Sequence, residues 1–378
     1  MNIGLYVHIP FCRQKCLYCD FSSFADMDHL QDEYVAALCR EITGQGGIFD
    51  EYIIDTVFIG GGTPTLLPAK LLVRLLDTLN SKLRIAAEAE VSIEANPGTA
   101  DYDKLRLLRE YGVNRISFGV QSFSSDLLKK LGRIHSPEEA VKAIEFAQKA
   151  GFRNVNIDLM YGLPDQTLAD LDSSLEQAVS LGIQHLSIYG LKVEEGTPFY
   201  KLREKEQLNL PTDDIDEAMY DWINHTAPAK GFNRYEISNY AKPGYECLHN
   251  LKYWLYKPYI GVGTAAHSFV NGERRANISQ VNQYIKIINQ SHSPVEYHES
   301  VDEDTAMAEF IFLALRTVAG MSLKAFSNEF KVDFLKKFPS IVENLQARRL
   351  VDINEQGIKL TELGMKYGNV VFASFLPD

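Results

Sequence analysis

Residues 12–19 read CRQKCLYC and hold three cysteines, Cys12, Cys16 and Cys19, in a C-x3-C-x2-C pattern. The pattern follows directly after Ile3–Ile9, an apolar run typical of a buried parallel β-strand. Thiolates are soft ligands that suit an iron–sulfur cluster or zinc. Three thiolates on a four-iron cluster leave one iron open to a small molecule, whereas a closed zinc site needs a further ligand. Because no second cysteine pair of this type follows, the spacing favours the cluster and keeps zinc as the alternative.

After this strand, short apolar runs alternate with amphipathic segments, which is typical of βα units around a parallel sheet. The expected strands are rich in Val, Ile, Phe and Tyr: Ile3–Ile9, Thr56–Ile59, Glu90–Ile93, Arg115–Phe118, Asn154–Leu159 and His185–Ile188. The expected helices between them include Glu33–Ile42, Lys70–Leu83, Tyr102–Glu110, Pro137–Lys149 and Leu168–Leu181. Six such units predict an α/β fold with a partial (β/α)6 barrel, because a closed barrel needs eight.

The chain divides into three predicted parts: the partial barrel at 1–240, a connecting segment at 241–300 and a C-terminal domain at 301–378. The last part reads as helix, short helix, helix and then a strand pair around Asn354–Gly357, an order similar to a winged helix. It holds 9 Lys and Arg against 11 Asp and Glu, so it lacks a basic face for nucleic acid. We expect a small, mainly helical, winged-helix-like domain that packs onto the barrel.

Composition narrows the function classes further. The 378-residue chain has 38 basic and 50 acidic side chains, which argues against a non-specific nucleic-acid partner. The first residues, MNIGLY, lack the positive and apolar regions of a signal peptide, and the longest apolar stretches are too short to span a bilayer. The five cysteines, three of them within eight residues, do not form a disulfide pattern. These features predict a cytoplasmic protein.

Unusual polar residues and glycines fall at the expected strand ends. Gly60–Pro64 follows the second strand, Glu94 ends the third, Gln121 follows the fourth and Asp158 lies within the fifth. Ligands of open parallel sheets bind outside the carboxyl ends of the strands, so these residues are expected to share a site. Consecutive glycines let the backbone approach a ligand closely, although a glycine run can also be only a tight turn. Arg133 is either a partner for a carboxylate or a surface charge.

The cysteine pattern, with Tyr18 before the third cysteine, resembles that of the radical S-adenosylmethionine (radical SAM) superfamily. The resemblance implies that Cys12, Cys16 and Cys19 hold a [4Fe–4S] cluster. It also implies that S-adenosylmethionine binds the open iron and is cleaved reductively to a 5′-deoxyadenosyl radical.

The strand-end residues extend the resemblance to the oxygen-independent coproporphyrinogen-III-oxidase-like branch, over nearly the whole chain. In that branch the matching positions contact S-adenosylmethionine. In this sequence they are Tyr6, Gly61, Gly62, Thr63, Glu94, Gln121, Arg133 and Asp158.

A further motif lies at residues 247–254, which read CLHNLKYW. Its H-N-x-x-Y-W part resembles the signature of the heme-chaperone (HemW-type) branch, which implies heme as a ligand. Imidazole is a good axial ligand for heme iron, so His249 is the candidate ligand, with Cys247 as a second ligand or a thiol for attachment. Tyr253 and Trp254 offer flat apolar faces to a porphyrin. The alternative is that His249 is a buried, hydrogen-bonded histidine in an aromatic core patch.

Two departures separate the chain from the true oxidases as the family is known. Phe21 stands where those enzymes carry a further cysteine, and only 11 residues precede Cys12. The predicted function is therefore heme binding and delivery to acceptor hemoproteins, such as membrane-bound respiratory cytochromes reached by transient membrane contact. A homodimer is compatible with this function. The alternatives are an oxygen-independent coproporphyrinogen III oxidase, which decarboxylates propionates by radical chemistry, and a binding module with structural zinc.

Overall fold

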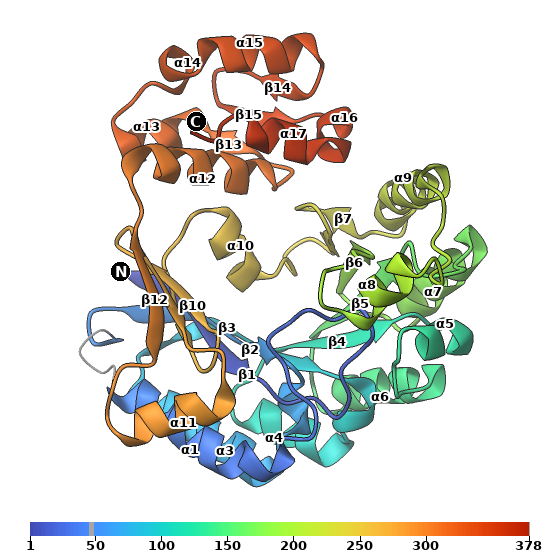
Figure 1. Ribbon diagram of the computed structural model, residues 1–378, viewed down its shortest axis with the longest axis vertical. Helices are drawn as coiled ribbons and strands as arrows, with labels where there is room; N and C mark the ends of the chain where they lie inside the picture. Colours follow the sequence, from blue (N-terminus) through green and yellow to red (C-terminus); the bar gives the residue numbers. More distant parts are fainter. Residues whose placement is uncertain (45–48, 378) are drawn as a thin grey trace.

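The computed structural model describes residues 1–44 and 49–377 and is built on a curved sheet whose central strands are parallel (Figure 1). These strands pair in chain order and follow the six expected apolar runs: β1 (Asn2–Ile9), β2 (Ile53–Gly61), β3 (Ile85–Ala95), β4 (Arg115–Gln121), β5 (Asn154–Tyr161) and β6 (His185–Gly190). The predicted α/β fold with a partial barrel is confirmed.

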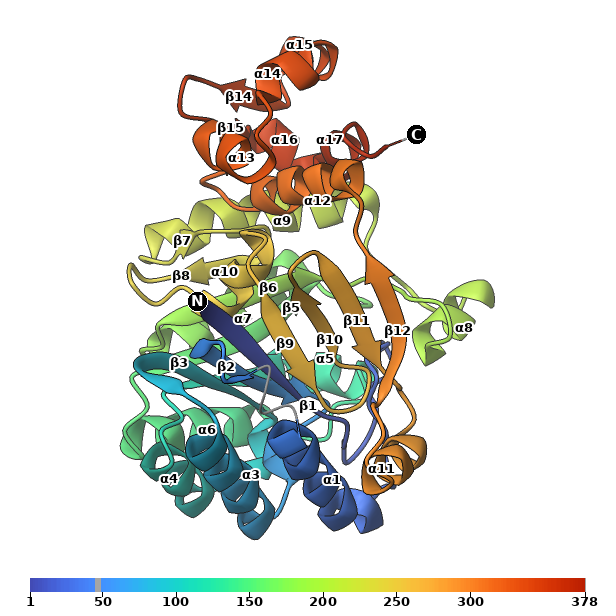
Figure 2. The ribbon, with the colours of Figure 1, turned by 90° about the vertical axis from the view of Figure 1, so that its left-hand side faces the viewer.

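Helices cover the outer face of this sheet (Figures 1 and 2). The five expected ones are present as α1 (Gln31–Gly44), α3 (Ala69–Lys82), α4 (Tyr102–Glu110), α6 (Pro137–Lys149) and α7 (Leu168–Ser180). Side-chain caps fix where α4, α6 and α7 begin: Asp101, Ser136 and Thr167 each accept a hydrogen bond from a backbone N–H of the first turn. Shorter connections hold η1 (Asp28–Leu30), η2 (Pro64–Leu66), η3 (Pro97–Thr99), α5 (Ser125–Lys130) and α8 (Pro198–Glu204), and α9 (Asp213–Ala229) follows.

The sheet extends beyond the six parallel strands on both sides. Next to β1 it continues with β9 (Tyr259–Val262), β10 (His267–Val270), β11 (Glu273–Asn277) and β12 (Val295–Ser300), and next to β6 with β8 (Asn239–Ala241) and β7 (Asn233–Arg234). Residues 241–300, which we expected to be a connecting segment, thus contribute strands to the same sheet. The predicted domain boundaries stay predictions. One local signal was present in the sequence, because Asn271-Gly272 joins β10 to β11 with both residues at positive φ.

Two elements of this region lie beside the sheet. Helix α11 (Val281–Asn289) packs against α1, and helix α10 (Leu248–Trp254) lies between the sheet and the C-terminal part of the chain (Figure 1).

The inner face of the parallel strands is polar. Residues two apart along a strand point to the same face, so Glu90, Ser92 and Glu94 of β3 share one side with Arg115 and Ser117 of β4. The residues between them are apolar and buried in the core cluster that also contains the facing sides of the helices. The sheet is therefore apolar toward its helices and hydrophilic toward the hollow that it curves around.

The C-terminal part forms a separate domain with its own hydrophobic core. It contains α12 (Glu303–Leu315), β13 (Met321–Ser322), α13 (Leu323–Phe330), α14 (Phe334–Lys337), α15 (Pro339–Ala347), β14 (Val351–Ile353), β15 (Gly357–Leu360), α16 (Glu362–Lys366) and α17 (Gly368–Ala373). The strands form a small antiparallel sheet in the order β13-β15-β14, as expected of a winged-helix-like domain. Arg274 and Glu309 join it to the larger sheet at 2.6 Å.

In residues 1–44 and 49–377, no helix combines the length and the apolar character needed to cross a membrane.

Candidate functional site

The residues predicted to hold the cluster and S-adenosylmethionine line one cavity of about 510 Å³ inside the curved sheet, together with the candidate heme ligand His249. They are Cys12, Cys16, Cys19, Tyr6, Gly61, Gly62, Thr63, Glu94, Gln121, Arg133, Asp158 and His249. The individual roles assigned to them stay predictions. Their convergence, however, makes this cavity the candidate functional site.

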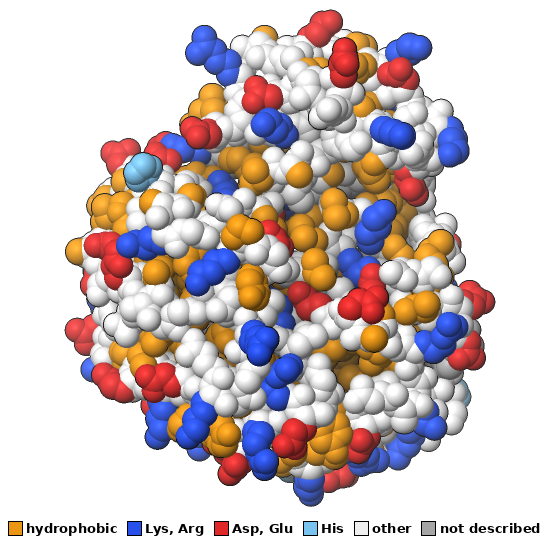
Figure 3. All heavy atoms as spheres, turned by 180° about the vertical axis from the view of Figure 1, so that it is seen from behind, with side chains coloured by type: hydrophobic (Ala, Val, Ile, Leu, Met, Phe, Trp, Pro, Cys, Tyr) orange, Lys and Arg blue, Asp and Glu red, His pale blue; other side chains and the backbone are white. Residues whose placement is uncertain are grey.

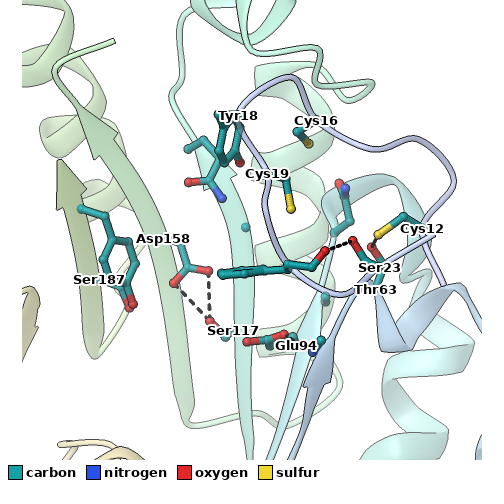
Figure 4. A pocket seen from close by; sticks show the side chains of 18 of the residues that line it. Cys12, Cys16, Tyr18, Cys19, Ser23, Thr63, Glu94, Ser117, Asp158 and Ser187 are labelled. Atoms are coloured by element: carbon teal, nitrogen blue, oxygen red, sulfur yellow. Dashed lines mark hydrogen bonds between the residues drawn. The ribbon is translucent and has the colours of Figure 1, made fainter. Parts of the chain in front are cut away.

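The loop after β1 places the three cysteine thiols along one wall of the cavity (Figure 4). All three are free thiols. Thr63 Oγ1 donates to Cys12 Sγ at 3.8 Å, and an Arg133 guanidinium nitrogen donates to Cys16 Sγ at 3.3 Å. Burial raises the pKa of the Cys12 and Cys19 thiols. Within the described chain, no group of three or more His, Cys, Asp and Glu side chains is arranged to hold a single metal ion.

The lack of a side chain at Gly62 lets the cysteine loop lie close to the backbone that follows β2. A Cβ atom at Gly62 would lie 2.6 Å from the Phe11 carbonyl oxygen and 3.0 Å from Cys12 Sγ, so any side chain there would displace the cysteine loop. Gly61, at φ +114°, would place a Cβ 2.6 Å from the His8 ring. Three cavity-lining thiols with hydrogen-bond donors on two sulfurs fit a [4Fe–4S] cluster, whose properties depend on such donors.

Two carboxylates face the same cavity in a low-dielectric setting. Glu94 accepts a hydrogen bond from the Gly61 N–H at 3.0 Å, and its pKa is raised to about 8 by burial and by the nearby charge of Asp158. Asp158 accepts from Asn156 Nδ2 at 2.7 Å and from Ser117 Oγ at 3.3 Å, and burial raises its pKa as well. A cationic ligand in this cavity would favour the ionised form of both carboxylates.

Gln121 and Arg133 also line the cavity, and Arg133 lies next to Cys16. Gln121 ends β4 with φ 71°, a left-handed conformation that costs energy for a residue other than glycine. Arg133 is largely buried and donates to the Gly119 carbonyl as well as to Cys16 Sγ. Both contacts lie within the cavity, and the role of Arg133 toward S-adenosylmethionine stays a prediction.

The deeper end of the cavity contains residues that we did not single out from the sequence. Arg115, Ser117, Asn156, Ser187 and Tyr189 line it from β4, β5 and β6. The sequence does contain a pattern that indicates them, because polar residues recur at every second position of each strand, for example Arg115 and Ser117. The alternation is hard to recognise because the apolar residues between them make each strand read as one apolar run.

A carboxylate of β3 anchors helix α10 in this polar hollow. Glu90 accepts hydrogen bonds from the backbone N–H groups of Leu248 and His249, each at 3.0 Å, and from Cys247 Sγ at 3.6 Å. A negative charge at a helix N-terminus is favourable because the first N–H groups lack partners within the helix. The helix is also tied to β2 by the Lys252–Asp55 ion pair at 2.8 Å.

His249 occupies the buried side of α10 with both ring nitrogens engaged. Nδ1 lies 2.9 Å from Thr56 Oγ1 and Nε2 lies 2.7 Å from the Tyr253 hydroxyl, while the ring stacks on Phe58. Burial, together with the positive charges of Lys252 and Arg115, lowers the pKa of His249 to about 3. His249 is thus a neutral, hydrogen-bonded histidine in an aromatic patch that also lines the cavity.

Cys247 is fully buried and is not among the described residues that line the cavity. Its thiol donates to Glu90, and burial raises its pKa to about 12. In this conformation Cys247 supports the start of α10 rather than facing a ligand.

A second, smaller hollow of about 220 Å³ lies between α10, the strands β9 to β11 and α12. Its walls include Tyr256, Tyr259 and Phe269, and Tyr253 lines both this hollow and the main cavity. Seen from behind, the surface is hollowed below the C-terminal domain, and hydrophobic side chains gather around the depression (Figure 3).

Comparisons with known proteins agree with this architecture. The family model of the radical SAM superfamily matches residues 6–178, and the model of the HemN C-terminal domain matches residues 301–366. The heme chaperone HemW of Bacillus subtilis (strain 168) is 40% identical over 99% of both chains. That of Escherichia coli (strain K12) is 45% identical over 71% of this chain and 70% of its own. The chain belongs to the HemW branch of the radical SAM superfamily.

Among solved structures, coproporphyrinogen III oxidase (HemN) from Escherichia coli has a TM-score of 0.88 to this HemW-family chain at 24% identity, covering 99% of this chain and 90% of that chain. This similarity shows a shared fold. Membership of the radical SAM superfamily implies a [4Fe–4S] cluster and S-adenosylmethionine, and the cavity described above has the thiols and polar groups to hold both. A cluster held by Cys12, Cys16 and Cys19 would supply an electron to S-adenosylmethionine bound beside it.

Replacement of the carboxylate under α10 is expected to loosen that helix. Glu90→Ala removes the acceptor of two backbone N–H groups and of the Cys247 thiol, which we expect to lower the free energy of unfolding by about 2 kcal/mol. Hydrogen exchange of the α10 amides should accelerate more than exchange in β3. Glu88→Ala, at an exposed position of the same strand, is the matched control. Unchanged exchange in α10 of Glu90→Ala would contradict the anchoring role.

Glu94 is expected to make the ligand-free protein less stable as the pH rises. The folded protein keeps this proton up to about pH 8, whereas the unfolded chain loses it near pH 4.5, so the folded state binds more protons in between. The free energy of unfolding therefore has its full contribution from Glu94 below pH 4.5 and loses it as the pH rises from 4.5 to 8. Over this interval it falls by at most about 1.4 kcal/mol per pH unit. Glu94→Gln should flatten the profile from denaturant unfolding over this interval. Burial also raises the pKa of Glu41 to about 7, so the free energy of unfolding of the Glu94→Gln variant should still fall somewhat as the pH rises. A profile identical to that of the parent would contradict the assignment.

Proposed function

We propose that the protein binds heme and delivers it to acceptor hemoproteins, using a fold that also holds a [4Fe–4S] cluster and S-adenosylmethionine. The observation that carries this proposal is the position of α10. The helix with the H-N-x-x-Y-W motif lines the same cavity as Cys12, Cys16 and Cys19 and at the same time borders the outer aromatic hollow. A heme near α10 would therefore be close to both the radical SAM core and the molecular surface.

Three further features support heme as the ligand. Relatives named heme chaperone HemW are similar over nearly the full length of the chain. Tyr253, Tyr256, Tyr259 and Phe269 place apolar ring faces around the outer hollow, and such faces suit a flat macrocycle. The basic side chains Lys257 and Arg274 at the same hollow suit propionate groups, although Arg274 is already paired with Glu299 and Glu309.

The finer parts of the function belong to the same proposal. The acceptors are hemoproteins such as respiratory cytochromes, which would require transient contact of a cytoplasmic protein with the membrane. A homodimer and the absence of a nucleic-acid partner likewise stay predictions. The fold shared with coproporphyrinogen III oxidase supports a second candidate, radical decarboxylation of porphyrinogen propionates.

The test is an anaerobic heme titration of cluster-loaded protein, followed by visible absorption and then by addition of a heme-free b-type cytochrome. We expect saturable binding, transfer of heme to the acceptor, and no release of carbon dioxide from coproporphyrinogen III in the presence of S-adenosylmethionine and a reductant. His249→Ala should bind heme more weakly, whereas His292→Ala, at an exposed position, should behave like the parent. Sustained decarboxylation without heme binding would favour the oxidase and reject the chaperone.

A further inference from the structure

Two alternatives were expected for His249, a ligand of heme iron and a buried, hydrogen-bonded histidine of the core. His249 has 1% of its surface exposed, and Thr56 and Tyr253 occupy its two ring nitrogens. An imidazole ligates iron through a nitrogen lone pair, so direct ligation by Nε2 would first require loss of the bond to Tyr253. Tyr253, one helical turn further along, is less buried and lines both the main cavity and the outer hollow.

The Tyr253 oxygen has the chemistry of an iron ligand. Tyrosine phenolate is one of the protein groups that hold heme iron. A phenol oxygen carries acceptor lone pairs besides its one proton, so the hydrogen bond to His249 leaves it able to bind a metal. The rings of Tyr253 and Tyr259 meet edge to face at 4.6 Å, which fixes the orientation of the phenol. Directly after α10, the backbone of Tyr256 adopts φ 55°, an uncommon conformation for a bulky residue.

We infer that the Tyr253 oxygen is the protein ligand of heme iron and that His249 is its hydrogen-bonded positioning partner. This inference rests on the proposed heme-binding function. Nε2 of the neutral His249 accepts a hydrogen bond from the free phenol. With Nδ1 accepting from the Thr56 hydroxyl, Nε2 can instead donate to the phenolate. Thr56–His249–Tyr253 thus forms a relay that serves both states of the oxygen.

Replacement of hydroxide by the Tyr253 oxygen on the heme iron requires neither an oxidant nor a reductant. Ferric heme with hydroxide on its iron gives up the iron–hydroxide bond and forms a bond from iron to the Tyr253 oxygen. The phenol proton and the hydroxide leave together as water, and the iron stays ferric. The reverse exchange, with water or an acceptor's own ligand, releases the heme.

The test compares ferric-heme spectra of the parent and variants. The parent should show a phenolate-to-iron charge-transfer band. Tyr253→Phe, which removes only the hydroxyl, should lose this band and bind heme about tenfold or more weakly. His249→Gln, which retains a hydrogen-bonding group beside the oxygen, should keep the band with a shifted position, and His249→Ala should keep it at reduced affinity. Tyr367→Phe, at an exposed tyrosine of the C-terminal domain outside both cavities, is the matched control for loss of a phenol hydroxyl and should leave the band unchanged.

Two results would overturn the inference. One is a Tyr253→Phe protein with the parent's spectrum and affinity. The other is an imidazole-type, band-free spectrum in the parent that only the His249 variants abolish. Each of these leaves heme binding intact and so retains the proposed function. If the parent shows no saturable heme binding, the proposed function fails, and the inference fails with it.

Discussion

The hydrogen bonds between the Glu90 carboxylate and the start of α10 connect the two halves of the candidate site. Glu90 belongs to β3, the strand that also carries Glu94 toward the cysteine end of the cavity. By holding the Leu248 and His249 N–H groups, it places the H-N-x-x-Y-W helix against the inner face of the sheet. Together with the Lys252–Asp55 ion pair and the Thr56–His249 hydrogen bond, this anchor fixes α10 relative to the cysteine loop.

The polar side chains on the inner face of the sheet cost free energy when they are buried, so their presence bears on what the hollow binds. Buried carboxylates such as Glu94 and Asp158 have raised pKa values because burial disfavours their charged forms. A hollow that served only as a core would not require such side chains. Their presence beside free thiols and the left-handed Gln121 indicates a site shaped for charged or metal-containing ligands. Helices and apolar side chains on the other face supply the stability that this arrangement requires.

Much of the fold could be predicted from the sequence because parallel strands and amphipathic helices have clear periods. The helices Tyr102–Glu110 and Pro137–Lys149 have the predicted bounds, since Asp101 and Ser136 cap them. The strands β9 to β12 were not predicted, because β9, which is parallel to β1, has only four residues and the antiparallel β10 to β12 lack the alternation of βα units. Site residues at strand ends could be found from motif spacing. Arg115 and Glu90 could not, because their importance depends on α10 returning to the sheet from more than a hundred residues away. Burial of His249 likewise required the tertiary structure, whereas its bond to Tyr253 is a local contact between residues four apart on α10.

The central claim is that the cysteine loop and α10 present two iron-containing groups to one continuous site. Anomalous diffraction at the iron edge, from crystals of protein loaded with cluster, S-adenosylmethionine and ferric heme, tests it most directly. The account predicts one iron peak beside Cys12, Cys16 and Cys19, and a second beside the Tyr253 oxygen with His249 still hydrogen-bonded to it. A heme iron bound away from α10, or directly by His249 after Tyr253 has moved aside, would contradict it.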